Sequence, residues 1–79
     1  MKVNITVYNT ELNKYISDRV LNLASIPNVG DKLVYDDKDD QGQVYNVDEV
    51  MYGDNELVTL FVRRIISLTE YNERRGLIR

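Results

Sequence analysis

The sequence predicts a mainly β fold: a small five-stranded, strongly bent sheet or partly open barrel with one short C-terminal helix. Three observations predict it. Short segments in which apolar and polar residues alternate recur along the chain, and they are rich in β-branched and aromatic residues. Tight turns separate these segments, and a clear helix-capping signature appears near residue 67. The 79 residues are enough for a single domain, 1–79.

The N-terminal part of the chain predicts a hairpin. Residues 2–8 alternate so that Val3, Ile5 and Val7 share one face of a half-buried strand. Residues 15–24 fit a strand that pairs with the first one. Their apolar side chains also fit a helical stripe that Thr10 would cap. An α+β fold in which residues 11–24 are helical is therefore the alternative.

A turn is expected at residues 26–31. Three further strands follow it, at residues 32–35, 43–52 and 57–66. Turn-forming residues join them. In the second of these strands the apolar phase switches after Val47, which indicates a β-bulge. The third is apolar on both faces, so something must cover the face that carries Phe61.

A C-terminal helix is predicted at about residues 68–75. Ser67 is followed three residues later by Glu70, which is the spacing of a capping box. Gly76 can close the helix in the left-handed conformation. Because a helix this short is not stable alone, we expect it to dock on the sheet, over Phe61.

The segments IPNVGDKLVY, VYNVDEV and ELVTLFVRR resemble the small Src-homology-3-like β-barrel proteins, uncharacterised, of phages, prophages and other mobile elements. The resemblance covers roughly residues 20–66 and rests on the periodicity of turns and strands. It implies a barrel and a mobile-element setting, and no defined activity.

Composition limits the possible chemistry. The chain has no cysteine and no histidine, which removes disulfides, thiolate chemistry and the commonest general base and zinc ligand. The usual fingerprints of cofactor, phosphate-loop and nucleophile sites do not occur, although Asp36 and Asp48 could form an acid–base pair. We therefore expect no enzyme and no cofactor. Without a long apolar run or a signal peptide, the expected location is the cytoplasm, of the host if the protein is phage-encoded.

Charge is sorted along the chain. Residues 31–56 hold nine acids and two lysines, 2 − 9 = −7, whereas residues 57–79 hold five arginines and two acids, 5 − 2 = +3. We expect an acidic surface that binds or inhibits a host macromolecule, most simply a protein with a basic surface, and that can imitate nucleic acid. Its expected residues are Asp36, Asp37, Asp39, Asp40, Asp48, Glu49, Asp54 and Glu56.

The arginines support an alternative. Together with a tyrosine they could bind single-stranded nucleic acid, because guanidinium groups bind phosphate and aromatic faces stack on bases. The candidate residues are Arg63, Arg64, Tyr71, Arg74, Arg75 and Arg79. The first two are neighbours on a strand and should point to opposite faces, with one of them paired to a carboxylate of the acidic half. A further alternative is a structural phage component that oligomerises through an exposed edge strand.

The loop that begins at Asp37 resembles a calcium-binding loop, with Asp37, Asp39, Gln41 and Asp48 as candidate ligands. Its last position is Asp rather than Glu, and strands rather than helices flank it. A solvated acidic turn is therefore the favoured interpretation, and no bound metal is expected.

Overall fold

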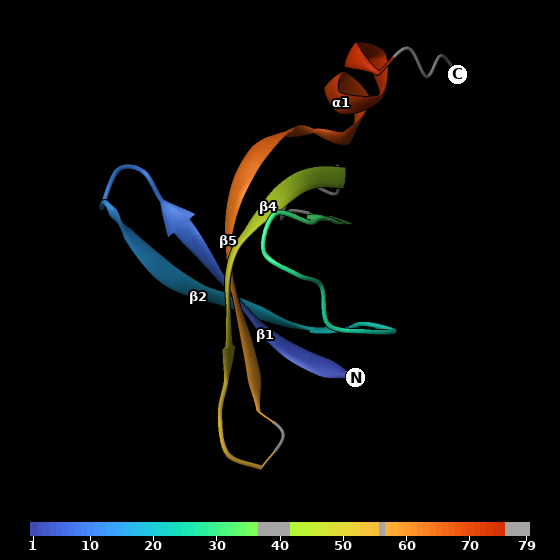
Figure 1. Ribbon diagram of the computed structural model, residues 1–79. Helices are drawn as coiled ribbons and strands as arrows, with labels where there is room; N and C mark the ends of the chain where they lie inside the picture. The colour runs from blue at the N-terminus through green and yellow to red at the C-terminus, as the bar shows by residue number, and fades with distance from the viewer. Residues whose placement is uncertain (37–41, 56, 76–79) are drawn as a thin grey trace.

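The computed structural model describes residues 1–36, 42–55 and 57–75, and these form one five-stranded sheet and one short helix (Figure 1). The strands are β1 (Lys2–Asn9), β2 (Lys14–Asn22), β3 (Lys32–Asp36), β4 (Gly42–Tyr52) and β5 (Val58–Ser67), and α1 (Leu68–Arg74) follows. The mainly β prediction is confirmed. The alternative of a helix in residues 11–24 is wrong, because this part of the chain pairs with β1 as the antiparallel strand β2.

The strand order is β2-β1-β5-β4-β3, so the first and the last strand lie side by side at the centre of the sheet. β1 and β5 are parallel and pair through Asn4–Val7 and Thr59–Val62, whereas the other neighbours are antiparallel. The sheet is mixed and open, so the expected barrel and the strong bend are wrong. Closure would require β2 and β3 to pair, and in the described part of the chain only side chains join these two strands.

Two side chains of β2 make this connection between the edges. Arg19 donates from Nη1 to the carbonyl oxygen of Asp36 at 2.7 Å, and Asp18 accepts a hydrogen bond from the Tyr35 hydroxyl at 3.2 Å. The guanidinium of Arg19 also lies over the Tyr35 ring, 4.9 Å from its centroid. Side-chain contacts of this kind hold the edges near each other without forming a ladder between them.

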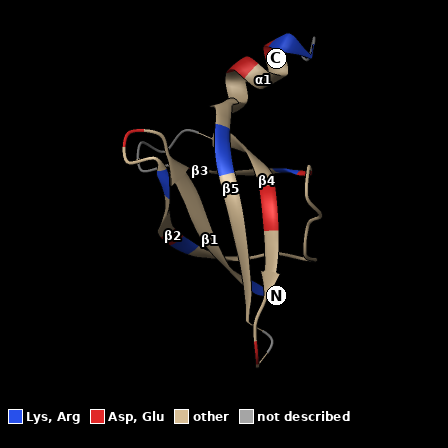
Figure 2. Ribbon diagram, turned by 60° about the vertical axis from the view of Figure 1, so that its left-hand side comes forward, with Lys and Arg blue, Asp and Glu red and all other residues tan. Residues whose placement is uncertain are grey.

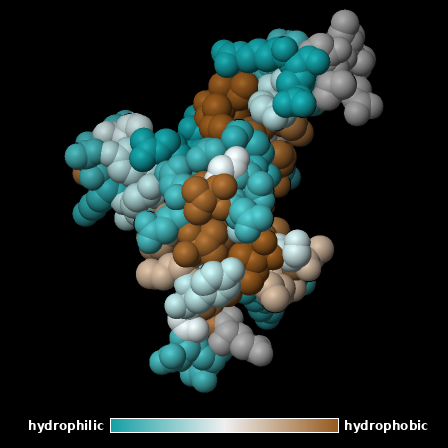
Figure 3. Space-filling model, in the orientation of Figure 1, coloured by the Kyte–Doolittle hydropathy of each residue, from teal (hydrophilic) through white to brown (hydrophobic). Residues whose placement is uncertain are grey.

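The core lies on one face of the sheet. Val3, Ile5, Val47, Leu60 and Val62 are almost completely buried there, as the alternation in β1 and β5 predicts. The rings of Tyr35 and Tyr45 stack beside them, with their centroids 4.2 Å apart. The connection between β2 and β3 crosses this face and packs Leu23 and Ile26 against it. Figure 3 shows apolar side chains coming to the surface between polar ones in the middle of the molecule.

The predicted β-bulge in β4 is confirmed. Val47 pairs with Val62 and Glu49 pairs with Phe61, so Asp48 is the extra residue. Val47 is buried in the core, and Val50 packs against the same core three residues later. The bulge therefore lets both residues face the core and turns Asp48 toward the other face.

Two more strands carry irregularities. In β2 the extra residue is Asp18, because Ile5 pairs with Arg19 and Thr6 with Ser17. In β5 the extra residue is Ile65, which is skipped between the pairs of Tyr45 with Arg64 and Val44 with Ile66. The side chain of Ile65 is consequently exposed.

The C-terminal helix is confirmed, and its cap is the predicted one: the Ser67 hydroxyl oxygen accepts a hydrogen bond from the backbone N–H of Glu70 at 3.2 Å. Leu68 packs against Gly42 at the start of β4. α1 lies beyond the end of β5 (Figure 1) rather than over Phe61, whose ring contacts Tyr15 instead. Gly76 lies outside the described residues. Within those residues, no helix is long and apolar enough to cross a membrane.

Candidate functional site

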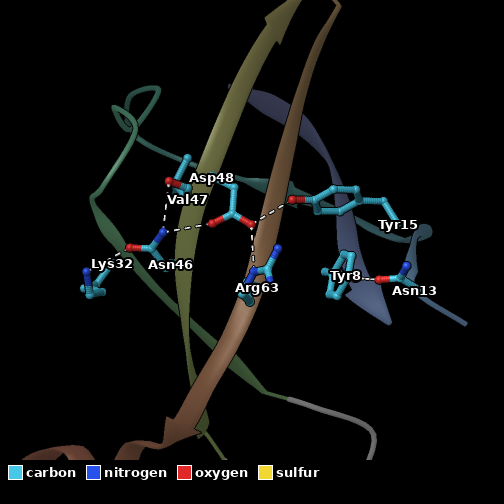
Figure 4. A network of polar contacts seen from close by, with 8 residues as sticks. All are labelled: Tyr8, Asn13, Tyr15, Lys32, Asn46, Val47, Asp48 and Arg63. Carbon is cyan, nitrogen blue, oxygen red and sulfur yellow. Dashed lines mark hydrogen bonds and ion pairs between the residues drawn. The ribbon is translucent and has the colours of Figure 1, made fainter. Parts of the chain in front are cut away.

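A network of polar contacts surrounds Asp48 on the face of the sheet opposite the core (Figure 4). One carboxylate oxygen, Oδ2, accepts hydrogen bonds from the Tyr15 hydroxyl at 2.8 Å and from Arg63 Nε at 3.2 Å. The other, Oδ1, accepts from Asn46 Nδ2 at 3.0 Å, and Asn46 accepts from Lys32 Nζ at 3.0 Å. The network thus joins β2, β3, β4 and β5 through one bulge residue.

These contacts set the charge of the network. Partial burial opposes ionisation of Asp48, but hydrogen bonds from Asn46, Tyr15 and Arg63 outweigh it and hold its pKa below 3.8. The hydrogen bond to Asp48, reinforced by burial, raises the pKa of Tyr15 above 10.0. Interactions with Tyr15 and Asp48 raise the pKa of Arg63. At neutral pH the network therefore holds an ionised carboxylate, a protonated phenol and a guanidinium.

Aromatic rings extend the network along the same face. The rings of Tyr8, Tyr15 and Phe61 meet edge to face in sequence, with both centroid distances at 5.2 Å. The guanidinium of Arg63 lies over Tyr8, 4.1 Å from the ring centroid, and the Tyr8 hydroxyl donates to Asn13 Oδ1. Arg63 is thereby held between an aromatic ring and a carboxylate, although half of its side chain is exposed.

A cleft lies where β1 and β5 separate. Their parallel ladder ends at the pair Val7 and Val62. Beyond it, β1 enters the hairpin with β2 while β5 continues beside β4, so the two strands diverge as a fork (Figure 1). The cleft in this fork has a volume of about 420 Å³. Its lining includes Tyr8, Glu11, Asp18, Tyr45, Arg63 and Arg64.

The two neighbouring arginines of β5 behave as the sequence predicts. Arg63 contacts Tyr8 and Asp48 on the face opposite the core, whereas Arg64 donates from Nε to Gln43 Oε1 at 2.8 Å. Gln43 and Tyr45 are buried on the core face, so the two guanidinium groups leave β5 in opposite directions. The expected pairing of one of them with a carboxylate is confirmed in the ion pair of Arg63 with Asp48. Arg64 forms no ion pair within the described part of the chain.

The predicted acidic residues occupy different elements. Asp36 ends β3, Asp48 and Glu49 lie in β4, and Asp54 follows β4 in the turn to β5. Figure 2 shows the acidic segment of β4 beside the basic segment of β5. Asp37, Asp39, Asp40 and Glu56 lie outside the described residues, so a continuous acidic surface stays a prediction. The carboxylate of Asp48 accepts the hydrogen bonds of the network, whereas Glu49 is exposed.

The helical arginines are also engaged. Arg74 forms an ion pair with Glu70, with 3.7 Å between Nη2 and Oε2, and Arg75 donates from Nη1 to the Tyr71 hydroxyl at 3.1 Å. The structure places them on and after α1, whereas Arg63 and Arg64 lie in β5. Arg79 lies outside the described residues.

A metal site gains no support from the described residues. Residues 1–36, 42–55 and 57–75 contain no group of three or more acidic side chains that could hold a metal ion. Three of the calcium candidates, Asp37, Asp39 and Gln41, lie outside these ranges. The fourth, Asp48, binds Tyr15, Asn46 and Arg63.

The sequence did not predict the fork or the aromatic cluster. The fork arises from the pairing of β1 with β5, which are more than fifty positions apart, and the aromatic cluster adds Phe61 of β5 to the hairpin pair of Tyr8 and Tyr15. Comparison with protein-family models, with curated proteins and with solved structures gave no match. The mobile-element setting therefore stays a prediction.

Proposed function

We propose that this chain is a small, non-enzymatic protein-binding domain. The observation that carries the proposal is the unpaired side of β5 in the fork. Arg63, Arg64 and Ile66 pair with β4 on one side, with Ile65 as a bulge between them, and the ladder with β1 on the other side ends at Val62. An unpaired strand edge is a template for another strand, so it suits a polypeptide better than a small molecule.

Charge supports a protein partner with a basic region. Glu49 and Asp54 are exposed, and neither forms an ion pair with another described residue. Arg19, Arg63 and Arg74 each have a carboxylate partner, whereas Arg64 and Arg75 form no ion pair with another described residue. Carboxylates without such partners attract a basic surface and orient its approach. A phage-encoded domain of this kind would bind or inhibit a host protein.

Single-stranded nucleic acid is the second candidate. The half-exposed guanidinium of Arg63 over the Tyr8 ring is a cation beside an aromatic face, the combination that binds bases and phosphates. However, Asp48 lies 3.2 Å from the same guanidinium and would repel a phosphate. This candidate therefore ranks below a protein partner.

Selection from a library of random peptides tests the proposal, with the immobilised wild-type domain as bait. The variant Leu60→Asp, which places a charge in the core, is the unfolded control. We expect to select peptides that bind the folded wild-type domain and do not bind the unfolded Leu60→Asp control. A fluorescently labelled oligonucleotide is titrated in parallel at low salt. Binding of the oligonucleotide with a steep salt dependence, and no selected peptide, would reverse the ranking. A self-associating mass in solution would favour the structural component instead.

A further inference from the structure

We propose that the cleft between β1 and β5 binds one extended peptide segment of the partner, which adds as a strand to residues 63–66 of β5 and places a carboxylate against Arg64. The inference rests on the proposed protein-binding function.

The backbone of β5 provides the length that strand addition needs. On the β4 side, Arg63 pairs with Asn46, Arg64 with Tyr45 and Ile66 with Val44. On the other side the ladder has already ended, so these residues present one open edge. At about 3.3 Å per residue the edge is at most roughly 13 Å long, since Ile65 is a bulge, and this matches three to four residues of an extended peptide. Backbone hydrogen bonds along it would supply affinity for a wide range of sequences.

The shape of the fork selects a single strand. β1 and its hairpin with β2 form the opposite wall of the cleft, and Tyr8 and Glu11 line that wall. A second copy of the domain would have to bring a whole sheet to this edge, into a cleft of about 420 Å³. A flexible segment of another protein is the occupant that fits.

Side chains in the cleft define the chemistry of the peptide. Arg64 is exposed and uses Nε for Gln43, and it has no carboxylate partner in the described part of the chain. Asp18, which also lines the cleft, already accepts hydrogen bonds from Arg19 and Tyr35. The peptide should therefore bring its own Asp or Glu, which a guanidinium binds through two parallel hydrogen bonds. Glu11 on the far wall repels acids, so the carboxylate belongs on the β5 side.

An apolar residue should accompany this carboxylate. Ile65, the bulge residue of β5, lines the cleft and has 43% of its surface exposed. A peptide side chain that covers it would remove apolar surface from water. The expected ligand is thus an extended segment that contains at least one acid and one apolar residue.

The test uses a peptide selected from the random library on the full-length domain. Its backbone nitrogens are methylated one at a time, and binding is measured by fluorescence anisotropy. Strand addition predicts a loss of binding at every second position, because only alternate N–H groups of a strand face its neighbour. Hydrogen exchange should slow at those amides of residues 63–66 that face the cleft rather than β4. The variant Arg64→Gln should bind about tenfold more weakly. Arg74→Gln, which removes an arginine of α1 outside the cleft, should bind like the wild type.

The outcomes separate this inference from the proposed function. Two results would overturn the cleft inference but not the proposed protein-binding function. In the first, methylation of the selected peptide does not weaken binding at every second position. In the second, the peptide protects amides outside residues 63–66. Tight binding of a purely basic peptide by the Arg64→Gln variant would also overturn it and would point to the acidic residues. If no peptide is selected, both the inference and the proposed function fail.

Discussion

Asp48 and Arg63 meet across the ladder of β4 and β5, with 3.2 Å between Oδ2 and Nε, and a β-bulge makes the contact possible. In a regular ladder Asp48 would pair directly with Phe61. As an extra residue it lies between two pairs, and its carboxylate reaches both Arg63 and the Tyr15 hydroxyl. The same bulge lets Val47 and Val50 both face the core. One inserted residue thus sets the phase of the core and the position of the network.

The variant Asp48→Asn should be less stable at neutral pH and should lose part of its sensitivity to acid. The pKa of Asp48 is lowered in the folded state, so its contribution to stability is present above 3.8 and is lost as the pH falls through the folded pKa. We expect a loss of about 1–2 kcal/mol at neutral pH. Urea denaturation at neutral pH and below pH 3.8 measures it, and the difference from the wild type should narrow in acid.

The matched control for this variant is Glu49→Gln. Glu49 is the next residue of β4, is exposed and forms no ion pair within the described ranges, so its change should stay within about 0.5 kcal/mol. An equal difference between Asp48→Asn and the wild type at both pH values would show that the carboxylate charge is not what stabilises the network.

The ring of Tyr35 should contribute far more to the stability of the fold than its hydroxyl does. The ring is buried and stacks on Tyr45, whereas the hydroxyl donates one hydrogen bond to Asp18 at 3.2 Å. Burial raises the pKa of Tyr35, so the hydroxyl stays a donor. We expect Tyr35→Phe to cost about 0.5–1.5 kcal/mol and Tyr35→Ala about 3–5 kcal/mol. Urea denaturation compares them. Similar costs for the two variants would mean that the link from β3 to β2, rather than the aromatic stack, stabilises this side of the core.

Local signals explain the parts of the fold that could be predicted. The alternation of Val3, Ile5 and Val7, the phase switch after Val47 and the cap at Ser67 all lie within one element or at its end. Each of these local patterns indicates which face of an element is buried or where the element begins or ends. The ion pair of one β5 arginine was also predictable, because neighbours on a strand face opposite ways and acids were abundant nearby.

The pairing of β1 with β5 could not be predicted, because alternation identifies the buried face of a strand and not its neighbour. Without that pairing, five strands with tight turns suggested a barrel rather than an open mixed sheet. The network around Asp48 could not be predicted for the same reason, because the hydrogen bond from Tyr15 to Asp48 joins residues 33 positions apart. The cleft is a direct product of the unpredicted pairing, since it lies where the two strands separate.

Gly42→Ala should loosen the docking of α1. A Cβ atom at this position would lie 3.1 Å from Leu68 Cδ2 and 3.3 Å from Leu68 Cβ, so Leu68 would have to move by a few tenths of an ångström. We expect a loss of about 1 kcal/mol, measured by urea denaturation. Gly53→Ala is the control, because its nearest neighbours would be 3.5 Å away, an ordinary contact. That change should be neutral or slightly stabilising. A stabilised Gly42→Ala variant would mean that Leu68 adjusts without cost.

Ser67→Ala should destabilise α1 by about 1 kcal/mol, because the hydroxyl oxygen that accepts from the Glu70 N–H is lost. Thr69→Ala, an exposed change within the helix, should be neutral or slightly stabilising. Hydrogen exchange is the decisive measurement, since a helix of seven residues depends on its cap and on its contact with Gly42. Helix amides should exchange faster while the amides of Leu60 and Val62 keep their protection. An equal loss of protection in β5 would show instead that the helix and the sheet unfold as one unit, with Leu68 transmitting the effect.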